Sequence, residues 1–558
     1  MFIKKNASFV FAGAVLTVLS ACGGGGGDVV IAPPPPPPVA ITKSEAFSFL
    51  NKATFGATDT EANAVISQRY SAWIDAQLAL PASTQLPGVQ AAYALLPQPV
   101  PNIAVLNTDR VDQWFRNSLR GQDQLRQRVA WALSQIMVVS QASTLTNLPH
   151  ALADYYDMLA RDAFGNYRKL LEDVTLHPAM GIYLSMLGNQ KPNTALNIRP
   201  DENYARECMQ LFSVGLVMLN DDGTVKLDAS SQAIPTYNQN TIEGFANVYT
   251  GWNYAGATTF NAARRSLTNQ VQPMQAYPEQ HSTSTKQLLT YSGAAITTIP
   301  AGQTPALDLQ NALDNIFNHP NVGPFISKQL IQKLVTSNPS AAYVARVTAK
   351  FNNDGSGARG NLGVVVKAVL TDAEALTSTT GANAGKVKEP LLRLTQLWRA
   401  YDGKAASGKY VFANPGSVFG QGPLQAGSVF NFFSPFYAPP GEIADQNLVA
   451  PELQLATEYL STLVTNYFYT QVFARTNAQT GLGADVVFID TSAEVAAAAD
   501  SEALVTKIAD KLLAGQISTT LKTEAKAQVE RVAATSTAQR VAEAMYLILS
   551  SPEYALQR

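Results

Sequence analysis

Cysteine and histidine are scarce in this sequence of 558 residues. The only cysteines are Cys22 and Cys208, a number that excludes a disulfide-rich fold. The four histidines are His150, His177, His281 and His319. No two of them have the i, i+4 spacing of a helical zinc-binding pair. A metal centre would therefore need three histidines, or additional carboxylates, to converge in the fold, and we expect no metal and no other cofactor.

Common catalytic signatures and a dominant charge are also missing. The sequence contains no G-x-S-x-G, H-E-x-x-H or C-x-x-C motif. Its G-x-G-x-x-G match, residues 355–360, follows a helical pattern rather than a strand, so we interpret it as a loop between helices. The 40 Lys and Arg nearly balance the 42 Asp and Glu, and no basic stripe is present. Nucleic-acid binding is therefore not expected.

The longest apolar run lies at the N-terminus and predicts export. Lys4 and Lys5 precede an apolar stretch at 9–19 that is too short to span a bilayer comfortably. The following Leu19-Ser20-Ala21-Cys22 resembles the lipobox of bacterial lipoproteins, in which the cysteine is acylated and becomes the new N-terminus. The alternative is an ordinary secretory signal ending in small residues. We expect residues 1–21 to be a lipoprotein signal peptide and Cys22 to be the lipidation site.

A Gly/Pro-rich tether follows at residues 22–41. Its glycines are flexible, whereas Pro33 to Pro38 favour polyproline II at ~3.1 Å per residue. The alternative is a spacer with no mechanical role. Loss of the signal would leave a net charge of about −4. The expected location is the bacterial cell envelope, facing the periplasm or the exterior. Gly23 stands where an acid would favour the inner membrane, so the outer membrane is favoured.

Residues 42–558 predict a mainly α, large multi-helix globular body, as one domain or as two or three closely packed ones. Thr42–Glu45 and Thr58–Glu61 match the capping box that begins a helix. Gly121 separates two predicted helices. Residues 221–306 are rich in Thr, Asn, Gln and Ser and predict a loop-rich insertion with a few short strands. Residues 408–450 predict a Gly/Pro/aromatic loop region.

The run DENYARECMQLFSVG begins at Asp201 and predicts an amphipathic helix. At 100° per residue, one face carries Asn203, Arg206, Glu207 and Gln210, and the opposite arc carries Tyr204 and Cys208. The polar face has two interpretations: a solvated stripe, or a buried or cleft-facing polar network. The helical pattern alone favours the solvated stripe, and we expect Cys208 to be an inert core thiol.

Several blocks of the chain resemble the bacterial domain-of-unknown-function family 1800 (DUF1800). They are FLNKATFGAT, DENYARECMQLFSVG, VYTGW, HPNVGPFISKQLIQKLV, SVFNFFSPFYAPPGEIADQNLVAPE and LILSSPEYALQ, in this order between residues 44 and 556. Part of that family carries a W-H-N-H-F run, where this chain has Ser134 and Gln135. The resemblance therefore gives no support for a metal site here, and the family implies no established activity.

The same resemblance implies that Asn203, Arg206 and Glu207 belong to a buried or cleft-facing polar network, and it singles out site residues. Asn203 and Tyr204 are candidate binding residues, and VYTGW and HSTSTK add Trp252, His281 and Lys286. We expect Trp252, His281 and Lys286 to line one cleft with the Asn203 helix.

Two classes of function remain open. One is a lipid-anchored binding or assembly factor, for which the resemblance implies a sulfatase-like exported partner. The other is a hydrolase-like enzyme on an envelope or extracellular polymer, with Glu207, Arg206 and His281 as catalytic candidates. An enzyme predicts an acid beside His281 in a concave pocket, whereas a binding factor predicts an exposed aromatic patch at 429–440.

Overall fold

The first helix begins where the capping box predicts. In the computed structural model, which describes residues 40–377, 384–412, 414–477 and 481–558, Thr42 caps α1 (Lys43–Ala53). The Thr42 Oγ1 accepts from the Glu45 N–H (3.2 Å), and the Glu45 carboxylate accepts from the Thr42 N–H (2.7 Å). Both N–H groups would otherwise lack partners in the first turn. The predicted signal peptide, Cys22 and nearly all of the tether lie outside the described residues.

Helices dominate the described residues, which confirms the mainly α class. Those before the insertion are α1, α2 (Asp59–Leu78), α3 (Leu86–Ala94), α4 (Leu106–Arg120), α5 (Gln124–Ser134), α6 (Pro149–Asp162), α7 (Tyr167–Leu176), α8 (Pro178–Tyr183) and α9 (Asn203–Gln210). As predicted, α4 ends at Gly121. In the part of the chain that the structure describes, no helix has the length and apolar character needed to cross a bilayer.

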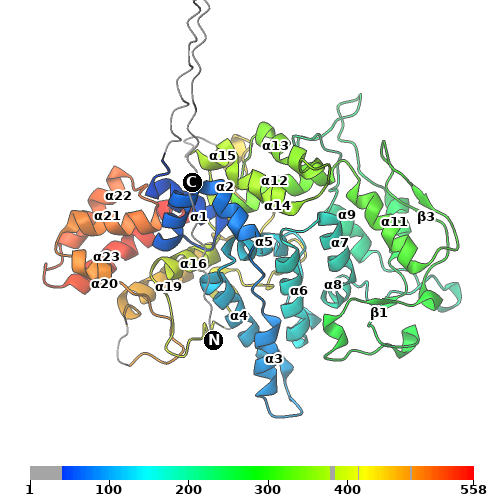
Figure 1. Cartoon of the computed structure of the whole chain (residues 1–558), viewed down its shortest axis with the longest axis horizontal. Helices are drawn as coiled ribbons and strands as arrows, with labels where there is room; N and C mark the ends of the chain where they lie inside the picture. Colours follow the sequence, from blue (N-terminus) through cyan, green and yellow to red (C-terminus); the bar gives the residue numbers. More distant parts are fainter. Residues whose placement is uncertain (1–39, 378–383, 413, 478–480) are drawn as a thin grey trace, which may run out of the picture. The chain divides into compact units, whose positions relative to one another are not determined.

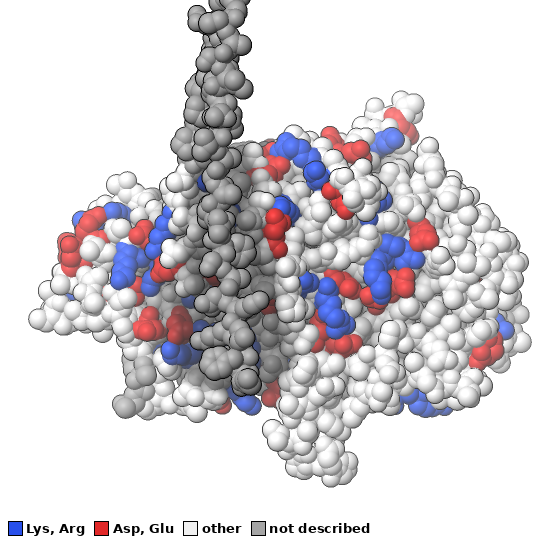
Figure 2. All heavy atoms as spheres, viewed as in Figure 1, with Lys and Arg blue, Asp and Glu red and all other residues white. Residues whose placement is uncertain are grey.

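The insertion is loop-rich, as expected, but it also contains a ten-residue helix that the sequence analysis missed. Its elements are α10 (Gln239–Val248) and the antiparallel strand pairs β1 (Trp252–Asn253) with β2 (Gln275–Ala276), and β3 (Lys286–Gln287) with β4 (Thr298–Ile299). Residues 229–307 contain only five Lys, Arg, Asp or Glu. The end of the body that carries β1 and β3 accordingly shows few charged side chains (Figures 1 and 2).

Helices resume after the insertion, in the predicted order. They are α11 (Pro305–Phe317), α12 (Val322–Leu334), α13 (Ala341–Asn352), α14 (Leu362–Thr371), α15 (Ala373–Leu376) and α16 (Pro390–Ala400), with β5 (Lys386–Val387) between α15 and α16. The glycine-rich residues 355–360 lie between α13 and α14, which confirms that they form a loop between helices. In the loop region that follows, residues 408–412 and 414–450 contain only two helices, each of four residues: α17 (Gly416–Phe419) and α18 (Glu442–Asp445).

The C-terminal helices lie at the opposite end of the body from the insertion (Figure 1). A short 3₁₀-helix, η7 (Pro451–Leu455), precedes α19 (Glu458–Ala474), α20 (Ser492–Ala497), α21 (Ser501–Leu512), α22 (Thr519–Glu530), α23 (Thr537–Leu549), α24 (Pro552–Ala555) and β6 (Leu556–Gln557). Strand β6 pairs antiparallel with β5, and the Ser48 Oγ donates to the Arg558 carbonyl (2.8 Å). The two ends of the described body therefore meet.

Helix α5 is the centre of the packing, because all eleven of its residues are buried. It contacts α1, α2, α4, α6 and α12. Its polar side chains reach the carbonyls at the ends of these neighbours: Arg126 donates to the carbonyls of Leu80 (3.0 Å) and Ala160 (3.1 Å). The carbonyls at the C-terminal end of a helix lack hydrogen-bond partners within the helix and carry partial negative charge, so a cationic side chain stabilises them.

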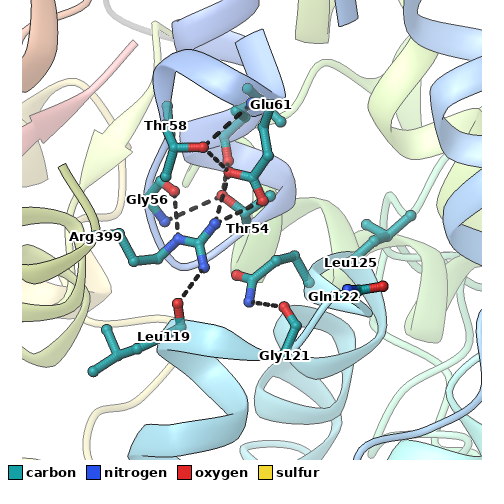
Figure 3. A network of polar contacts seen from close by, with 12 residues as sticks. Thr54, Gly56, Thr58, Glu61, Leu119, Gly121, Gln122, Leu125 and Arg399 are labelled. Carbon is teal, nitrogen blue, oxygen red and sulfur yellow. Dashed lines mark hydrogen bonds and ion pairs between the residues drawn. The ribbon is translucent and has the colours of Figure 1, made fainter. Parts of the chain in front are cut away.

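One arginine connects the corner between α1 and α2 to the rest of the body (Figure 3). Arg399 of α16 donates to the carbonyls of Gly56 (2.7 Å) and Leu119 (2.9 Å), and its Nη2 donates to both carboxylate oxygens of Glu61. Gly56 has φ +139°, and a Cβ there would lie 2.5 Å from the Gln396 Cα. The block FLNKATFGAT is therefore explained by packing and by this network.

Arg399→Lys should destabilise the fold, because an ammonium cannot reach three acceptors on different segments as the planar guanidinium does. The Arg399 side chain is only 4% exposed. We expect a loss of about 3 kcal/mol in the free energy of unfolding, measured in urea. Arg206→Lys is the matched control, because its pair with Glu202 is exposed and should contribute less than about 1 kcal/mol. Equal shifts for the two variants would contradict the assignment.

Candidate functional site

The polar face of α9 is mostly a solvated surface. Asn203 is exposed, and the side chain of Arg206 is 44% exposed. Arg206 Nη2 donates to Glu202 (2.6 Å) and to Gln239 of α10 (3.0 Å) at the surface. Of the expected buried or cleft-facing network of Asn203, Arg206 and Glu207, the buried form is therefore wrong for the first two members. The interpretation as a solvated stripe holds for them, because the deeper arc of the helix is already filled by apolar side chains.

The opposite arc of α9 lies in the core, as the helical wheel predicts. Tyr204, proposed as a binding residue, is 1% exposed, and its hydroxyl pairs with the Thr175 Oγ1 (2.6 Å). Cys208 is fully buried, and burial raises the pKa of its thiol to about 11. Tyr204 therefore offers no surface to a ligand, and Cys208 is an unreactive core thiol.

Glu207 differs from Asn203 and Arg206, because it points partly inward. It is half-buried, and its Oε2 accepts no hydrogen bond from the described residues. Burial raises the pKa of Glu207, and the nearby Arg206 only partly offsets this. The same carboxylate adds to the burial that raises the pKa of Tyr237 to about 12. Glu207 is thus a carboxylate in an unfavourable place rather than a member of a completed network.

The blocks VYTGW and HSTSTK do come together in the fold. The His281 Nδ1 donates to the Thr250 carbonyl (2.9 Å), and its Nε2 lies 2.9 Å from the Asp308 Oδ2. Lys286 Nζ lies 2.7 Å from the same oxygen. Gly251 permits this close approach. It has φ +82°, and a Cβ added there would lie 2.8 Å from the backbone nitrogen of His281. His281, Asp308 and Lys286 form a buried charged triad, and the sequence analysis missed Asp308.

This triad is sealed and separate from the face of α9. His281, Asp308 and Lys286 are each 1% exposed or less. Helix α10 contacts both α9 and β3, so it lies between the Arg206 surface and Lys286. Trp252 is 5% exposed, and its indole N–H has no partner among the described residues. Trp252, His281 and Lys286 are each 5% exposed or less, so they do not line a cleft open to solvent, whereas Asn203 is exposed on α9.

The largest buried charged group lies elsewhere, around Glu389. We call it the Glu389 cluster, and its members are Arg128, Lys333, Lys386, Glu389 and Glu452, each 6% exposed or less. The Glu389 Oε2 accepts from the side chains of Trp131 (2.9 Å), Gln135 (2.8 Å) and Gln421 (3.0 Å). Lys333 Nζ donates to the Gln135 Oε1 (2.9 Å). One amide thus bridges an anion and a cation.

The electrostatics of the Glu389 cluster favour a charged carboxylate. Burial alone would raise the pKa of Glu389, but Lys386, Arg128 and Lys333 outweigh it and leave that pKa below its usual value. Burial lowers the pKa of Lys333 to about 8. Lys386 pairs with Glu452 at 2.8 Å. Four atoms of the cluster have no hydrogen-bond partner among the described residues: Arg128 Nε and Nη1, Glu389 Oε1 and Glu452 Oε2.

An aromatic loop, residues 427–440, is fixed from beneath by the cluster. The Asn431 amide donates to the Gln135 Oε1 (3.2 Å), Phe432 stacks on Trp131, and the Phe433 ring lies 4.3 Å from Lys333 Nζ. Phe430 and Phe436, which flank these three residues in the chain, are 55% and 74% exposed. The loop therefore presents two large apolar side chains on a fixed backbone.

The sequence did contain a signal for the Glu389 cluster. Arg128 and Gln135 are seven residues apart, about two helical turns, in an otherwise apolar run. Gln135 also falls within the run where part of the family has W-H-N-H-F. The partners come from residues 333, 386–389 and 452, so only the fold reveals them. Within the described ranges, no three or more His, Cys, Asp and Glu side chains are grouped to hold a metal ion.

Substitution of Gln for Glu should lower the free energy of unfolding strongly at Glu389 and hardly at all at Glu207. Glu389→Gln leaves three buried cations with only Glu452, and we expect a loss of about 3 kcal/mol or more in the free energy of unfolding. Glu207→Gln replaces a carboxylate whose charge burial disfavours, so we expect a change within about 0.5 kcal/mol. Urea unfolding at pH 7 measures both.

The dependence on pH gives a second readout for Glu389. Its pKa is lowered in the folded state, so its contribution to stability is present at neutral pH. That contribution should begin to fall below the usual pKa of 4.5 and should be lost once the pH passes the lower folded value. Two equally stable variants at pH 7 would contradict the distinction between Glu389 and Glu207.

Comparisons with known proteins agree with the earlier resemblance. The family model described as "Protein of unknown function (DUF1800)" matches residues 48–556. No curated protein and no solved structure matches the chain. The matched range includes α9, the buried triad, the Glu389 cluster and the aromatic loop. The chain therefore belongs to the DUF1800 family of proteins of unknown function.

Proposed function

We propose that this protein is a lipid-anchored binding or assembly factor of the bacterial cell envelope, which docks another exported protein on its aromatic loop. The observation that supports this is the exposure of Phe430 and Phe436 above a backbone held by Asn431, Phe432 and Phe433. Large aromatic side chains on a preorganised surface are typical anchors of protein interfaces, because little conformational entropy is lost on binding. This patch of two exposed aromatic side chains is narrower than the patch that the sequence predicts at 429–440.

The chemistry of the surface favours a protein as the partner. On the face seen in Figure 2, Lys and Arg lie interspersed with Asp and Glu, without a large basic area of the kind that binds nucleic acid. The resemblance to the family adds a sulfatase-like exported protein as the partner to test. The anchor at Cys22 and the preference for the outer membrane rest on the lipobox and on Gly23.

The enzymatic alternative has less support. His281 does meet an acid, Asp308, but both side chains are 1% exposed or less, so a polymer cannot reach them. Glu207 and Arg206 lie on the other side of α10, and no hydrogen bond among the described residues links them to His281. A hydrolase acting on a polymer needs its acid and base in contact with the substrate.

Cys22→Ser should release the protein from membranes. Without the thiol no thioether-linked lipid can be attached, and the membrane affinity of the acyl chains is lost. Fractionation of cells and incorporation of labelled palmitate measure the outcome, with Cys208→Ser as the control because that thiol is buried. Retention of Cys22→Ser in the membrane fraction would contradict the anchor.

The double variant Phe430→Ser/Phe436→Ser should lose partner binding while remaining folded. Two exposed anchors should each contribute about 2 kcal/mol, so we expect Kd for the captured sulfatase-like protein to rise by 100-fold or more. A pull-down from membranes with the anchored chain identifies the partner, and titration gives Kd. Leu95→Ser is the matched control, because Leu95 is 86% exposed far from the loop in sequence. Unchanged binding by the double variant would refute docking on this loop.

A further inference from the structure

A cavity of about 260 Å³ lies beside the Glu389 cluster and is distinct from the aromatic loop. It is formed by the start of α16, by η7, by α19 and by the junction of α23 and α24. Its walls are mainly apolar, and they include Leu453, Leu455, Leu460, Val464, Phe468 and Leu549. The exposed Ser461 and Ser550 also line it, so the cavity opens to solvent on that side.

Arg393 brings an unpaired cation to this cavity. Its guanidinium makes no hydrogen bond or ion pair with any described residue, and its Nε is closed off from solvent. Lys388 lies nearby: its Nζ donates to the Gln396 Oε1 (2.7 Å) and lies 4.1 Å from the centroid of the Tyr554 ring. No carboxylate of the described chain lies within 4.0 Å of either cation. Burial holds the pKa of Lys388 well below its usual value, so Arg393 supplies the uncompensated positive charge of this wall.

Glu452 brings an unpaired acceptor to the same cavity. It is 2% exposed; its Oε1 pairs with Lys386, whereas its Oε2 is buried without a partner in the described chain. A buried carboxylate oxygen without a hydrogen bond costs free energy, as does a desolvated guanidinium without an acceptor. A ligand that supplied one acceptor and one donor would satisfy both groups.

We propose that this cavity binds a small apolar α-amino acid. Its carboxylate would accept hydrogen bonds from Arg393, and its ammonium would donate to the Glu452 Oε2. The apolar side chain would lie against Val464 and Phe468. Because a cavity of about 150 Å³ holds benzene, one of 260 Å³ holds about ten non-hydrogen atoms, which is the size of leucine.

The ligand chemistry follows from the pairing of the two groups. A guanidinium binds a carboxylate through two parallel hydrogen bonds, which a lysine cannot reproduce. The Glu452 Oε1 pairs with Lys386, whereas the Oε2 has no partner among the described residues and is closed off from water, so a ligand ammonium reaches it once the Glu452 side chain turns toward the cavity. Inorganic anions would satisfy Arg393 but would leave both Glu452 and the apolar wall without a partner.

Calorimetric titration of the full chain in detergent tests this with three matched ligands. L-leucine carries both charged groups, 4-methylpentanoate lacks the amine, and 3-methylbutylamine lacks the carboxylate. We expect leucine to bind and each analogue to bind about 10- to 100-fold more weakly, because each loses hydrogen bonds to a charged group. N-acetyl-leucine, which mimics the end of a peptide, should be as weak as 4-methylpentanoate.

Substitutions at Arg393 and Glu452 test which residue contacts each charged group of the ligand. Arg393→Met should raise Kd for leucine at least tenfold and leave Kd for 3-methylbutylamine unchanged. Arg346→Met is the matched control, because Arg346 is exposed and pairs with Asp372. Glu452→Gln should make leucine and 4-methylpentanoate bind equally, and if that variant fails to fold, the ligand series on the parent chain decides. Three results would each overturn the proposal. They are no binding of leucine at about 10 mM, equal binding of leucine and 4-methylpentanoate by the parent chain, and displacement of leucine by equimolar inorganic phosphate.

Discussion

The carboxylate of Glu389 is kept charged in a place from which water is excluded, and much of the structure is arranged around it. Removing a charge from water costs several kcal/mol even after relaxation, so the surroundings must supply both opposite charge and hydrogen bonds. Lys333, Lys386 and Arg128 supply the charge, and Trp131 and Gln135 are among the donors. These groups come from α5, α12 and the approach to α16. Their relative positions are therefore set by one buried anion.

A second buried charged group has the same role in the insertion. Its strands are only two residues long, so backbone pairing cannot fix its course. His281, Asp308 and Lys286 instead connect the end of α10, the segment before β3 and the first turn of α11. Directional contacts of this kind specify one arrangement among many that are equally apolar. All three side chains are 1% exposed or less, so a polymer cannot reach them.

The aromatic loop, the Glu389 cluster and the cavity are contiguous. Glu452 of η7 belongs to the cluster and lines the cavity. Gln454, two residues later, accepts from the Ser434 N–H (2.8 Å), and the Ala450 N–H donates to the Tyr437 carbonyl (2.9 Å). The loop thus rests on the cluster on one side and on η7 on the other. A surface held at both ends loses little entropy when a partner binds.

Local patterns in the sequence determined the helices, their caps and the family. The capping box at Thr42 and the break at Gly121 each depend on residues close together in the chain, and the structure confirms them. The arc of α9 that carries Tyr204 and Cys208 was also readable, because 3.6-residue periodicity alone decides which face is apolar. Helix α10 was missed because its Thr, Asn and Gln content hides a weak apolar stripe.

Only the tertiary structure decided which polar residues are buried. Asn203 and Arg206 share a motif with Glu207, yet they face solvent, whereas Glu389 lies at the centre of the body. Sequence spacing cannot place Gln135 beside Lys333, nearly two hundred residues later, or Glu452 beside Lys386. A buried charge is stable only where distant segments supply its partners, and those segments are brought together by the packing of helices around α5.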